Sequence, residues 1–126
     1  MIIIDIKYVL FSAKGRINRL TFWVYNIPLL AFQVFLKFAE EGMFPILKGD
    51  TVYLVFFPVI LIFVWISLAL GIKRCHDRDQ SGWWMLLLLV PLVGPLWLLI
   101  SLGIIKGTEG TNRYGRDPFV KYAVHG

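Results

Sequence analysis

The stretch TVYLVFFPVILIFVWISLALGI, residues 51–72, decides the fold because it contains no charged residue. As a helix rising about 1.5 Å per residue it would be roughly 33 Å long, close to the thickness of a bilayer's hydrocarbon core, about 30 Å. It shows no polar face, so the core helix of a soluble protein is the weaker interpretation. The stretch therefore predicts a full transmembrane helix.

The composition of the whole chain agrees with a membrane environment. Of its 126 residues, 58% are hydrophobic and only 17% are charged, and a water-soluble domain of this size has too small an interior for so much apolar surface. The single cysteine, Cys75, excludes an internal disulfide and a multi-cysteine metal cage. The net charge of +5 comes from basic residues beside apolar segments. That placement suits anionic lipid, so we expect no nucleic-acid partner.

The N-terminal part predicts a second span and a helix at the membrane surface. Residues 20–36 form an uncharged run just long enough to cross, and Asn18 can cap a helix that begins at Arg19. Residues 1–19 carry apolar side chains at helical spacing among charged ones, which is typical of a short helix in the membrane interface. A frayed apolar tail is the alternative. Gly15 permits a sharp turn before the span.

A third apolar segment, residues 83–105, is broken in its middle by Pro91, Gly94 and Pro95. In a bilayer such a break is compatible with a kinked third span or with a re-entrant hairpin, provided that neighbouring groups satisfy the carbonyls that proline frees. The length of the segment favours the kinked span, because halves of about ten residues cannot cross.

The distribution of basic residues favours the hairpin. Residues 1–21 carry four Lys or Arg, residues 37–50 carry two, residues 73–82 carry three and the tail, residues 106–126, carries four. A full third crossing splits them seven against six, whereas a hairpin splits them eleven against two. Because Lys and Arg accumulate on the cytoplasmic side, we expect the N-terminus, the 73–82 loop and the tail to be cytoplasmic.

These patterns predict an all-α integral membrane protein that forms a single membrane domain over residues 1–126. It has two full transmembrane helices, the Pro/Gly-broken third segment as a hairpin or kinked span, and a short interfacial N-terminal helix.

Three polar blocks carry the motifs of the chain. They are FSAKGRINRLTFW (residues 11–23), IKRCHDRDQSGWW (72–84) and GTEGTNRYGRDP (107–118), with PLVGP (91–95) before the last. Together they resemble the DUF805 family, the YhaH/YhaI-like small bacterial inner-membrane proteins of unknown function. The resemblance covers nearly the whole chain. It implies a multi-pass protein of the bacterial inner membrane and supplies no established reaction.

The resemblance also points to individual positions. In the order of the chain they are Gly15, Arg16, Arg19, Trp23, Arg74, His76, Asp77, Ser81, Gly82, Trp83, Gly107, Gly110, Asn112, Arg113, Tyr114, Gly115, Asp117 and Pro118. The sequence departs from the usual family residues at Asn18, Thr21, Asp79, Gln80, Glu109, Thr111 and Arg116. These departures affect any binding specificity carried over from the family more than they affect the fold.

The basic and polar side chains of the three blocks form a candidate site. If the blocks converge at one membrane face, their guanidinium groups can line a pocket for phosphate, and anionic lipid headgroups are the nearest phosphates. The candidate residues are Arg16, Arg19, Arg74, His76, Asp77, Arg78, Asn112, Arg113, Tyr114 and Arg116. We expect them to bind anionic lipid or a membrane partner. A homo-oligomer is a further possibility, and we expect no cofactor and no metal.

The pair His76-Asp77 has other interpretations. In a purely structural turn, Asp77 accepts backbone N–H groups or pairs with an arginine, His76 contacts a carbonyl, and Asp77 or Ser81 caps the next helix. Adjacent side chains point in different directions, so the pair is not by itself a catalytic dyad. A non-enzymatic role is therefore favoured over a membrane-embedded enzyme.

A subunit of an oligomeric transporter or channel is a further alternative. Broken apolar segments occur at transport sites. The spans, however, hold no ionisable residue of the kind that marks an ion or proton pathway.

Overall fold

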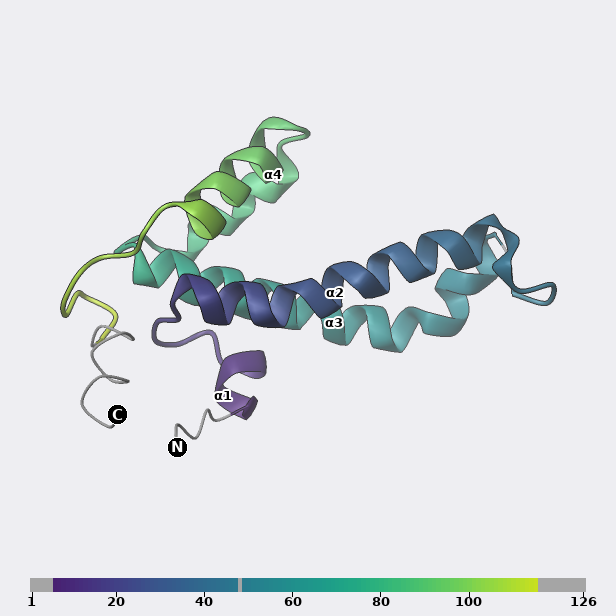
Figure 1. Ribbon diagram of the computed structural model, residues 1–126, viewed down its shortest axis with the longest axis horizontal. Helices are drawn as coiled ribbons and strands as arrows, with labels where there is room; N and C mark the ends of the chain where they lie inside the picture. The colour runs from purple at the N-terminus through teal and green to yellow at the C-terminus, as the bar shows by residue number, and fades with distance from the viewer. Residues whose placement is uncertain (1–5, 48, 116–126) are drawn as a thin grey trace.

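The computed structural model describes residues 6–47 and 49–115, most of which are helical (Figure 1). Helices α2 (Arg19–Phe38) and α3 (Asp50–Asp77) run antiparallel and side by side, and the π-helical turn η1 (Ala39–Met43) follows α2. Both helices are long and apolar enough to cross a membrane. The two spans expected from the sequence are thus present as helices.

The ends of the two long helices follow from their sequence. Asn18 caps α2 as expected, because its Oδ1 accepts the backbone N–H of Thr21 at 2.8 Å. Helix α3 does not end with its apolar run at Ile72 but continues to Asp77. Polarity alone does not end a helix when its side chains find buried partners, so the first half of the 73–82 segment, expected as a loop, is helical.

Aromatic side chains hold α2 against α3. The ring of Phe32 packs edge-to-face on Phe63, with centroids 4.5 Å apart, and on Phe56 at 6.1 Å. Phe35 meets the same Phe56 ring at 6.0 Å. Edge-to-face contacts stabilise such pairs by about 0.5–1.5 kcal/mol beyond their burial. The interface is therefore a ladder of phenylalanines, and the opposite faces of both helices remain exposed and apolar.

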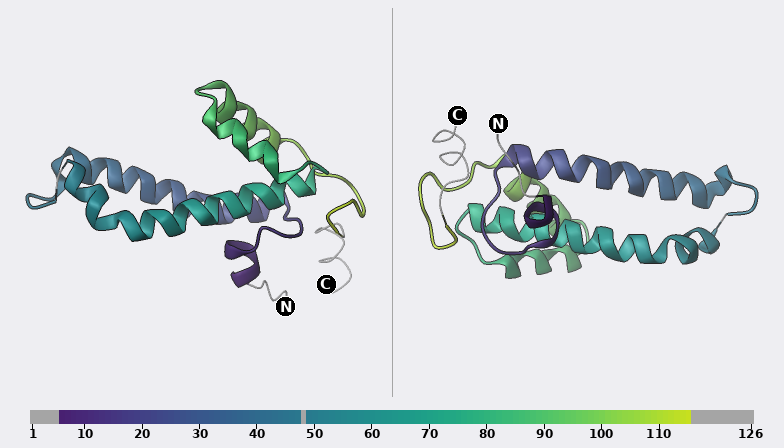
Figure 2. Two further views of the ribbon diagram at one scale, coloured as in Figure 1. Left: turned by 180° about the vertical axis from the view of Figure 1, so that it is seen from behind. Right: turned by 90° about the horizontal axis from the view of Figure 1, so that it is seen from below.

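A short helix, α1 (Ile6–Phe11), lies on one side of the α2–α3 pair, opposite the later hairpin (Figures 1 and 2). Its last carbonyls have no partner within the helix. The buried ammonium of Lys73 donates to the carbonyls of Tyr8, at 2.6 Å, and Val9, and the indole of Trp65 donates to that of Phe11 at 3.0 Å. Helix α1 therefore docks on α3 through these donors, and its place at the membrane interface stays a prediction. Residues 1–5 lie outside the described residues.

The third apolar segment folds back on itself. The 3₁₀ helix η2 (Gly82–Leu89) leaves the end of α3, and α4 (Val93–Leu98) with the π-helical η3 (Leu99–Ile104) returns beside it. Figures 1 and 2 show that this hairpin points obliquely back along the α2–α3 pair and reaches only part of its length.

Local features explain where the hairpin starts and turns. Ser81 caps η2, since its Oγ accepts the backbone N–H of Trp83 at 3.3 Å. At the turn Leu92 has φ +63°, a conformation that side chains rarely adopt. The two legs then touch at Gly94, where an added Cβ would lie 1.5 Å from the carbonyl oxygen of Leu87. Only glycine permits the legs to approach so closely.

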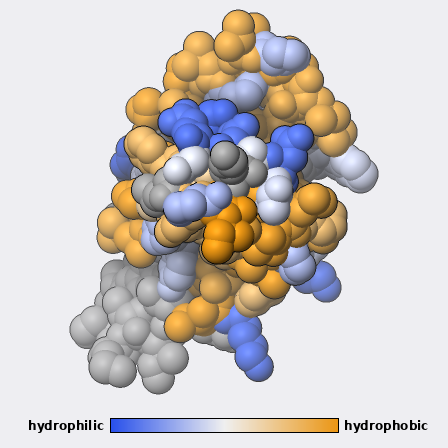
Figure 3. Space-filling model, turned by 90° about the vertical axis from the view of Figure 1, so that its right-hand side faces the viewer, coloured by the Kyte–Doolittle hydropathy of each residue, from blue (hydrophilic) through white to orange (hydrophobic). Residues whose placement is uncertain are grey.

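The end of the α2–α3 pair at which the two helices are connected carries polar groups. Figure 3 looks onto this end and shows hydrophilic atoms surrounded by hydrophobic surface. Here the Lys37 ammonium pairs with Glu40 at 2.9 Å, and the hydroxyl of Tyr53 donates to the same carboxylate at 2.8 Å. Glu41 and Asp50 add two acidic groups. Each end of the pair thus carries polar groups, with apolar surface between them.

Candidate functional site

Three polar segments meet at the end of the pair where α2 begins and α3 ends (Figures 1 and 2). They are residues 12–19, residues 73–81 and residues 105–115, and we call them together the polar head. The hairpin of η2, α4 and η3 brings them together, because it leads the chain away from the end of α3 and back to it. The three sequence blocks expected to converge do lie together over their described residues.

Asp77 lies at the centre of the polar head, between two arginines. One carboxylate oxygen is 3.0 Å from a guanidinium nitrogen of Arg16, and the other contacts the guanidinium of Arg74. Arg16 is 6% exposed, Asp77 5% and Arg74 not at all. Charges removed from water are costly unless they are paired and hydrogen-bonded. Two cations beside one carboxylate also leave a surplus positive charge, which backbone carbonyls stabilise.

Arg16 fastens the tail to the end of α3. Its guanidinium donates to the carbonyls of Thr108 at 2.6 Å, Gly110 at 2.7 Å and Gly115 at 3.2 Å, while its Nε donates to Asp77 at 3.1 Å. A guanidinium has five N–H donors. With the fifth, from Nη2 to the Asp77 carbonyl at 3.4 Å, all of them are occupied, so Arg16 has a structural role and no donor left for a ligand.

The end of η3 is capped by side chains from two other helices. The last carbonyls of a helix have no partner within it, and here each of four consecutive carbonyls receives a side-chain donor. The pairs are Arg74 Nε to Leu102 (2.7 Å), Trp23 Nε1 to Gly103 (2.8 Å), Arg19 Nη1 to Ile104 (2.9 Å) and Arg74 Nη2 to Ile105 (2.7 Å). These bonds anchor the returning leg of the hairpin to α2 and α3.

The chain after η3 passes directly over the carboxylate of Asp77. The backbone N–H of Thr108 donates to the Asp77 carbonyl at 2.7 Å. At Gly107 an added Cβ would lie 1.9 Å from Asp77 Oδ2. The tail can therefore approach the buried ion pairs only with glycine at this position.

His76 joins the first and third segments of the polar head. Its Nδ1 lies 3.0 Å from the carbonyl oxygen of Gly15, so Nδ1 carries the proton and donates it. The ring stacks on Tyr114 with centroids 3.9 Å apart and planes within 4°. Asn112 donates to the His76 carbonyl at 2.9 Å. The contacts expected of a structural role, an arginine at Asp77, a carbonyl at His76 and the Ser81 cap, are thus present, although His76 and Asp77 lie at the end of helix α3 and not in a turn.

Two further candidate arginines, Arg78 and Arg113, lie nearer the surface. Arg113 pairs with Asp79 at 3.1 Å and donates to its carbonyl at 2.8 Å. The hydrogen bond to the Asp79 carboxylate raises the pKa of Arg113 above its ordinary value. Arg78 donates to the hydroxyl of Ser101 in η3. Arg116, the last candidate, lies outside the described residues.

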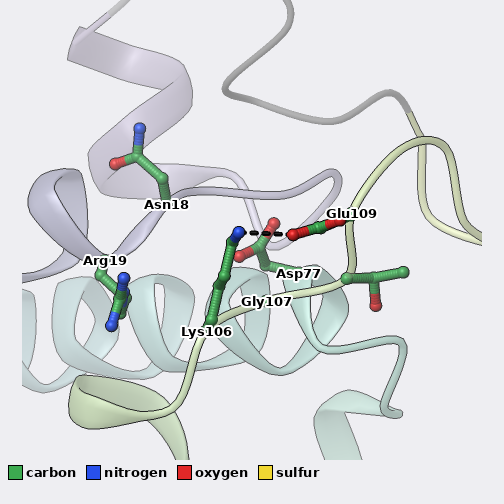
Figure 4. Close-up of a pocket in the computed structure, with 7 residues that line it drawn as sticks. Asn18, Arg19, Asp77, Lys106, Gly107 and Glu109 are labelled. Carbon is green, nitrogen blue, oxygen red and sulfur yellow. Dashed lines mark hydrogen bonds and ion pairs between the residues drawn. The ribbon is translucent and has the colours of Figure 1, made fainter.

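A cavity of about 430 Å³ opens beside the buried ion pairs (Figure 4). Its lining residues are Asn18, Arg19, Asp77, Lys106, Gly107, Thr108 and Glu109. At its rim the ammonium of Lys106 pairs with Glu109 at 2.5 Å, and both side chains are mostly exposed. Of the candidate arginines that the structure describes, only Arg19 lines this cavity.

Sequence reasoning grouped all the arginines and left out most of the residues that line the cavity. Asn18 was identified only as a helix cap, and Lys106 and Glu109 only as a charge and a family departure. Their signal was weak because an isolated basic or acidic residue after an apolar segment is normally a solvated one. Lys73 was also missed as the anchor of α1.

The described residues contain no group of three or more His, Cys, Asp or Glu side chains that could hold a metal ion.

The cavity lining offers hydrogen-bond donors and two cations, Arg19 and Lys106, and the carboxylate of Asp77 in its wall is already paired to arginine. Such a set of groups suits recognition of an anion.

Comparisons with known proteins agree with this architecture. A family model described as "Protein of unknown function (DUF805)" matches residues 10–116. The chain is 37% identical to the inner membrane protein YhaI of Escherichia coli K12, over 89% of this chain and 88% of that protein. It is 30% identical to the inner membrane protein YhaH of the same strain, over 83% and 85%. The uncharacterized protein YiiR of that strain is 30% identical over 86% of each chain. No solved structure matches the chain.

Proposed function

Because the chain belongs to the DUF805 family of proteins of unknown function, with relatives named as inner membrane proteins, we propose that it binds anionic lipid headgroups through its polar head. The role is one of binding and not of catalysis. In support, the carboxylate of Asp77 is held by two arginines and Nδ1 of His76 by a carbonyl, which leaves neither group arranged as an acid–base pair.

The proposed membrane topology has two full spans and a re-entrant hairpin. The 20 residues of α2 measure about 30 Å as a helix, which is enough to cross the hydrocarbon core. Each hairpin leg is shorter. The 8 residues of η2 rise roughly 16 Å as a 3₁₀ helix, and residues 93–104 rise roughly 18 Å. Legs of that length enter about half of the bilayer and return to the same side.

This topology places the polar head in the cytoplasm. It gathers eleven of the thirteen basic residues of the chain on the side of the polar head, against two at the opposite end. Lys and Arg accumulate on the cytoplasmic side of inner-membrane proteins. The cytoplasmic leaflet is also where anionic lipid produces a negative surface potential that attracts basic side chains.

Helix α1 belongs at the same membrane surface. Its buried Val9 packs towards Ile66 and Leu70 of α3, whereas its Ile6 and Phe11 remain exposed. This six-residue helix thus has one apolar side packed on α3 and further apolar side chains exposed. Such a helix suits the boundary between headgroups and acyl chains.

One observation carries the lipid-binding proposal: the cation-lined cavity lies where exposed apolar surface begins. Arg19 is followed directly by Leu20, which is 72% exposed, and Lys106 is preceded by Ile104 and Ile105, which are 59% and 40% exposed. A phospholipid has the same order of groups, a phosphate followed by acyl chains. An arrangement of cation and then apolar surface therefore matches a lipid better than a soluble anion.

The proposal is tested by native mass spectrometry of the purified protein released from mixed bilayers. Nanodiscs that contain equal amounts of phosphatidylglycerol and phosphatidylcholine should yield protein enriched in bound phosphatidylglycerol. Raised salt present during equilibration of the nanodiscs should reduce that enrichment, because exposed charges are screened. Equal retention of both lipids contradicts lipid binding and favours a protein partner for the polar head.

A further inference from the structure

We infer that the cavity between the start of α2 and the end of η3 is a seat for one phosphodiester of an anionic phospholipid, with Arg19, Lys106 and Asn18 as its donors. This inference rests on the proposed function and names the site within it. Figure 4 shows these three side chains around the cavity.

Arg19 supplies the guanidinium that the seat needs. One of its nitrogens donates to the Ile104 carbonyl at 2.9 Å, which fixes the side chain at the cavity wall. Among the described residues, its other two nitrogens, Nε and Nη2, form no hydrogen bond or ion pair. Guanidinium groups bind phosphate through paired N–H donors. Arg19 is thus oriented by the protein and keeps donors for a ligand, unlike the buried Arg16 and Arg74.

Asn18 adds a neutral donor and the end of a long helix. Its Oδ1 accepts the N–H of Thr21 at 2.8 Å, which leaves the amide nitrogen as a donor. The cavity also lies at the N-terminus of the 20-residue α2, where the helix dipole favours an anion. Both features add to the attraction of Arg19 and Lys106 for an anion, although neither would bind an anion alone.

Lys106 is held in place by an exposed ion pair that a phosphate can replace. Its ammonium lies 2.5 Å from Glu109, with the two side chains 63% and 79% exposed. Exposed pairs of this kind contribute little stability. A phosphate in the cavity can therefore take over the ammonium of Lys106.

The charge around the cavity favours an anion. The carboxylate of Asp77 in the wall is already held by Arg16 and Arg74. Those two arginines with Arg19 and Lys106 outnumber the carboxylates of Asp77 and Glu109. The volume of about 430 Å³ is within the range of small-molecule sites and exceeds the needs of a phosphate alone. The remaining space accommodates a glycerol headgroup.

The flanking surface identifies the phosphate as part of a lipid. The exposed side chains of Leu20, Ile104 and Ile105 continue from the two cations along the outside of α2 and η3. Acyl chains attached to a seated phosphate would lie against them. A soluble phosphate ester gains nothing from this apolar surface, so the site should prefer the diacyl lipid over its soluble headgroup.

The test compares single variants in the same mixed nanodiscs. Arg19→Ala and Lys106→Ala should each reduce phosphatidylglycerol retention about tenfold, the loss expected for one charge-assisted hydrogen bond. Lys37→Ala is the matched control, since it removes one exposed ammonium from an i,i+3 ion pair with Glu40 at the opposite end of the α2–α3 pair, and it should retain lipid as the wild type does. Glu109→Gln should increase retention because it frees Lys106.

Two further arms keep the outcomes distinct. Glycerophosphoglycerol, the soluble headgroup, should not displace the lipid at millimolar concentration, and displacement would overturn the assignment to a lipid. If the wild type shows no preference for phosphatidylglycerol, the proposed function fails. If the preference persists equally in Arg19→Ala and Lys106→Ala, lipid binding stands and this seat is wrong. Lys106→Ala guards against misfolding, because among residues 6–47 and 49–115 its ammonium forms a hydrogen bond and ion pair with the exposed Glu109 alone.

Discussion

Arg16 and Asp77, 61 residues apart in the chain, form a buried ion pair with a nitrogen–oxygen distance of 3.0 Å. The pair joins the segment before α2 to the end of α3. The carbonyls that Arg16 also binds at Thr108 and Gly110 add the tail to the same unit. The polar head is therefore one connected structure, and its stability should depend on its central carboxylate.

Replacing Asp77 with asparagine should destabilise the protein strongly. The change leaves Arg16 and Arg74 buried without their counter-charge, and removing one partner of a buried pair costs about 3–5 kcal/mol. Denaturation of the purified protein in detergent by increasing sodium dodecyl sulfate measures the loss. Asp79→Asn is the control, because it breaks only the exposed pair with Arg113 and should cost less than about 1 kcal/mol. Equal effects of the two variants would contradict a central role for Asp77.

Gly107→Ala should release the tail from α3. A Cβ at this position would lie 1.9 Å from Asp77 Oδ2, so either the tail or the carboxylate must move. We expect faster proteolysis of the tail and a lower melting temperature. The neighbouring Thr108→Ala keeps both backbone hydrogen bonds at that residue and should behave like the wild type. A stable Gly107→Ala protein would show that the tail does not pack over Asp77.

The hairpin should be sensitive to Gly94 and tolerant at Leu92. Gly94→Ala places a Cβ 1.5 Å from the Leu87 carbonyl and should separate the two legs, lowering the melting temperature. Leu92→Gly removes a side chain from a positive-φ position, which costs an L-residue roughly 1–2 kcal/mol in the left-handed conformation, and should leave the protein as stable or more so. The reverse order of stabilities would exclude this turn geometry.

The stack of His76 on Tyr114 should depend on the ring and not on the hydroxyl. Tyr114→Phe keeps an aromatic face at 3.9 Å from the imidazole and should retain wild-type protection of the tail. Tyr114→Ala removes the stack, a contact of about 0.5–1.5 kcal/mol, and should increase hydrogen exchange at Asn112. Identical exchange in both variants would show that the stack does not hold the tail.

The sequence predicted the local features of the fold well and the long-range ones less completely. The two spans, the Asn18 cap and the Ser81 cap depend on nearby residues, and all are present. For the third segment, charge favoured the hairpin and length favoured the kinked span, because both place Pro91 and Gly94 in the same apolar surroundings. The close approach of Gly94 to the Leu87 carbonyl, which brings the two legs together, is a contact that hydropathy and charge do not encode.

The candidate site shows the same limit. Charge alone grouped Arg16, Arg19 and Arg74 as one phosphate-binding set. Their roles separate in the structure because carbonyls from the tail and η3 occupy the donors of Arg16 and Arg74, whereas Arg19 stays at the cavity rim. Which arginine is buried depends on residues 28 to 99 positions away. Anionic-lipid binding by the set stays a prediction.

The side of the membrane that holds the tail distinguishes the hairpin from a full third crossing. Single cysteines introduced as Glu109→Cys in the tail and Glu41→Cys at the opposite end can be labelled with a membrane-impermeant maleimide, in a background where the native Cys75 is replaced by alanine. With the polar head in the cytoplasm, Glu41→Cys is labelled in spheroplasts, and Glu109→Cys is labelled only in inverted vesicles. Labelling of Glu109→Cys in spheroplasts would make the third segment a full crossing and would contradict a single cytoplasmic polar head.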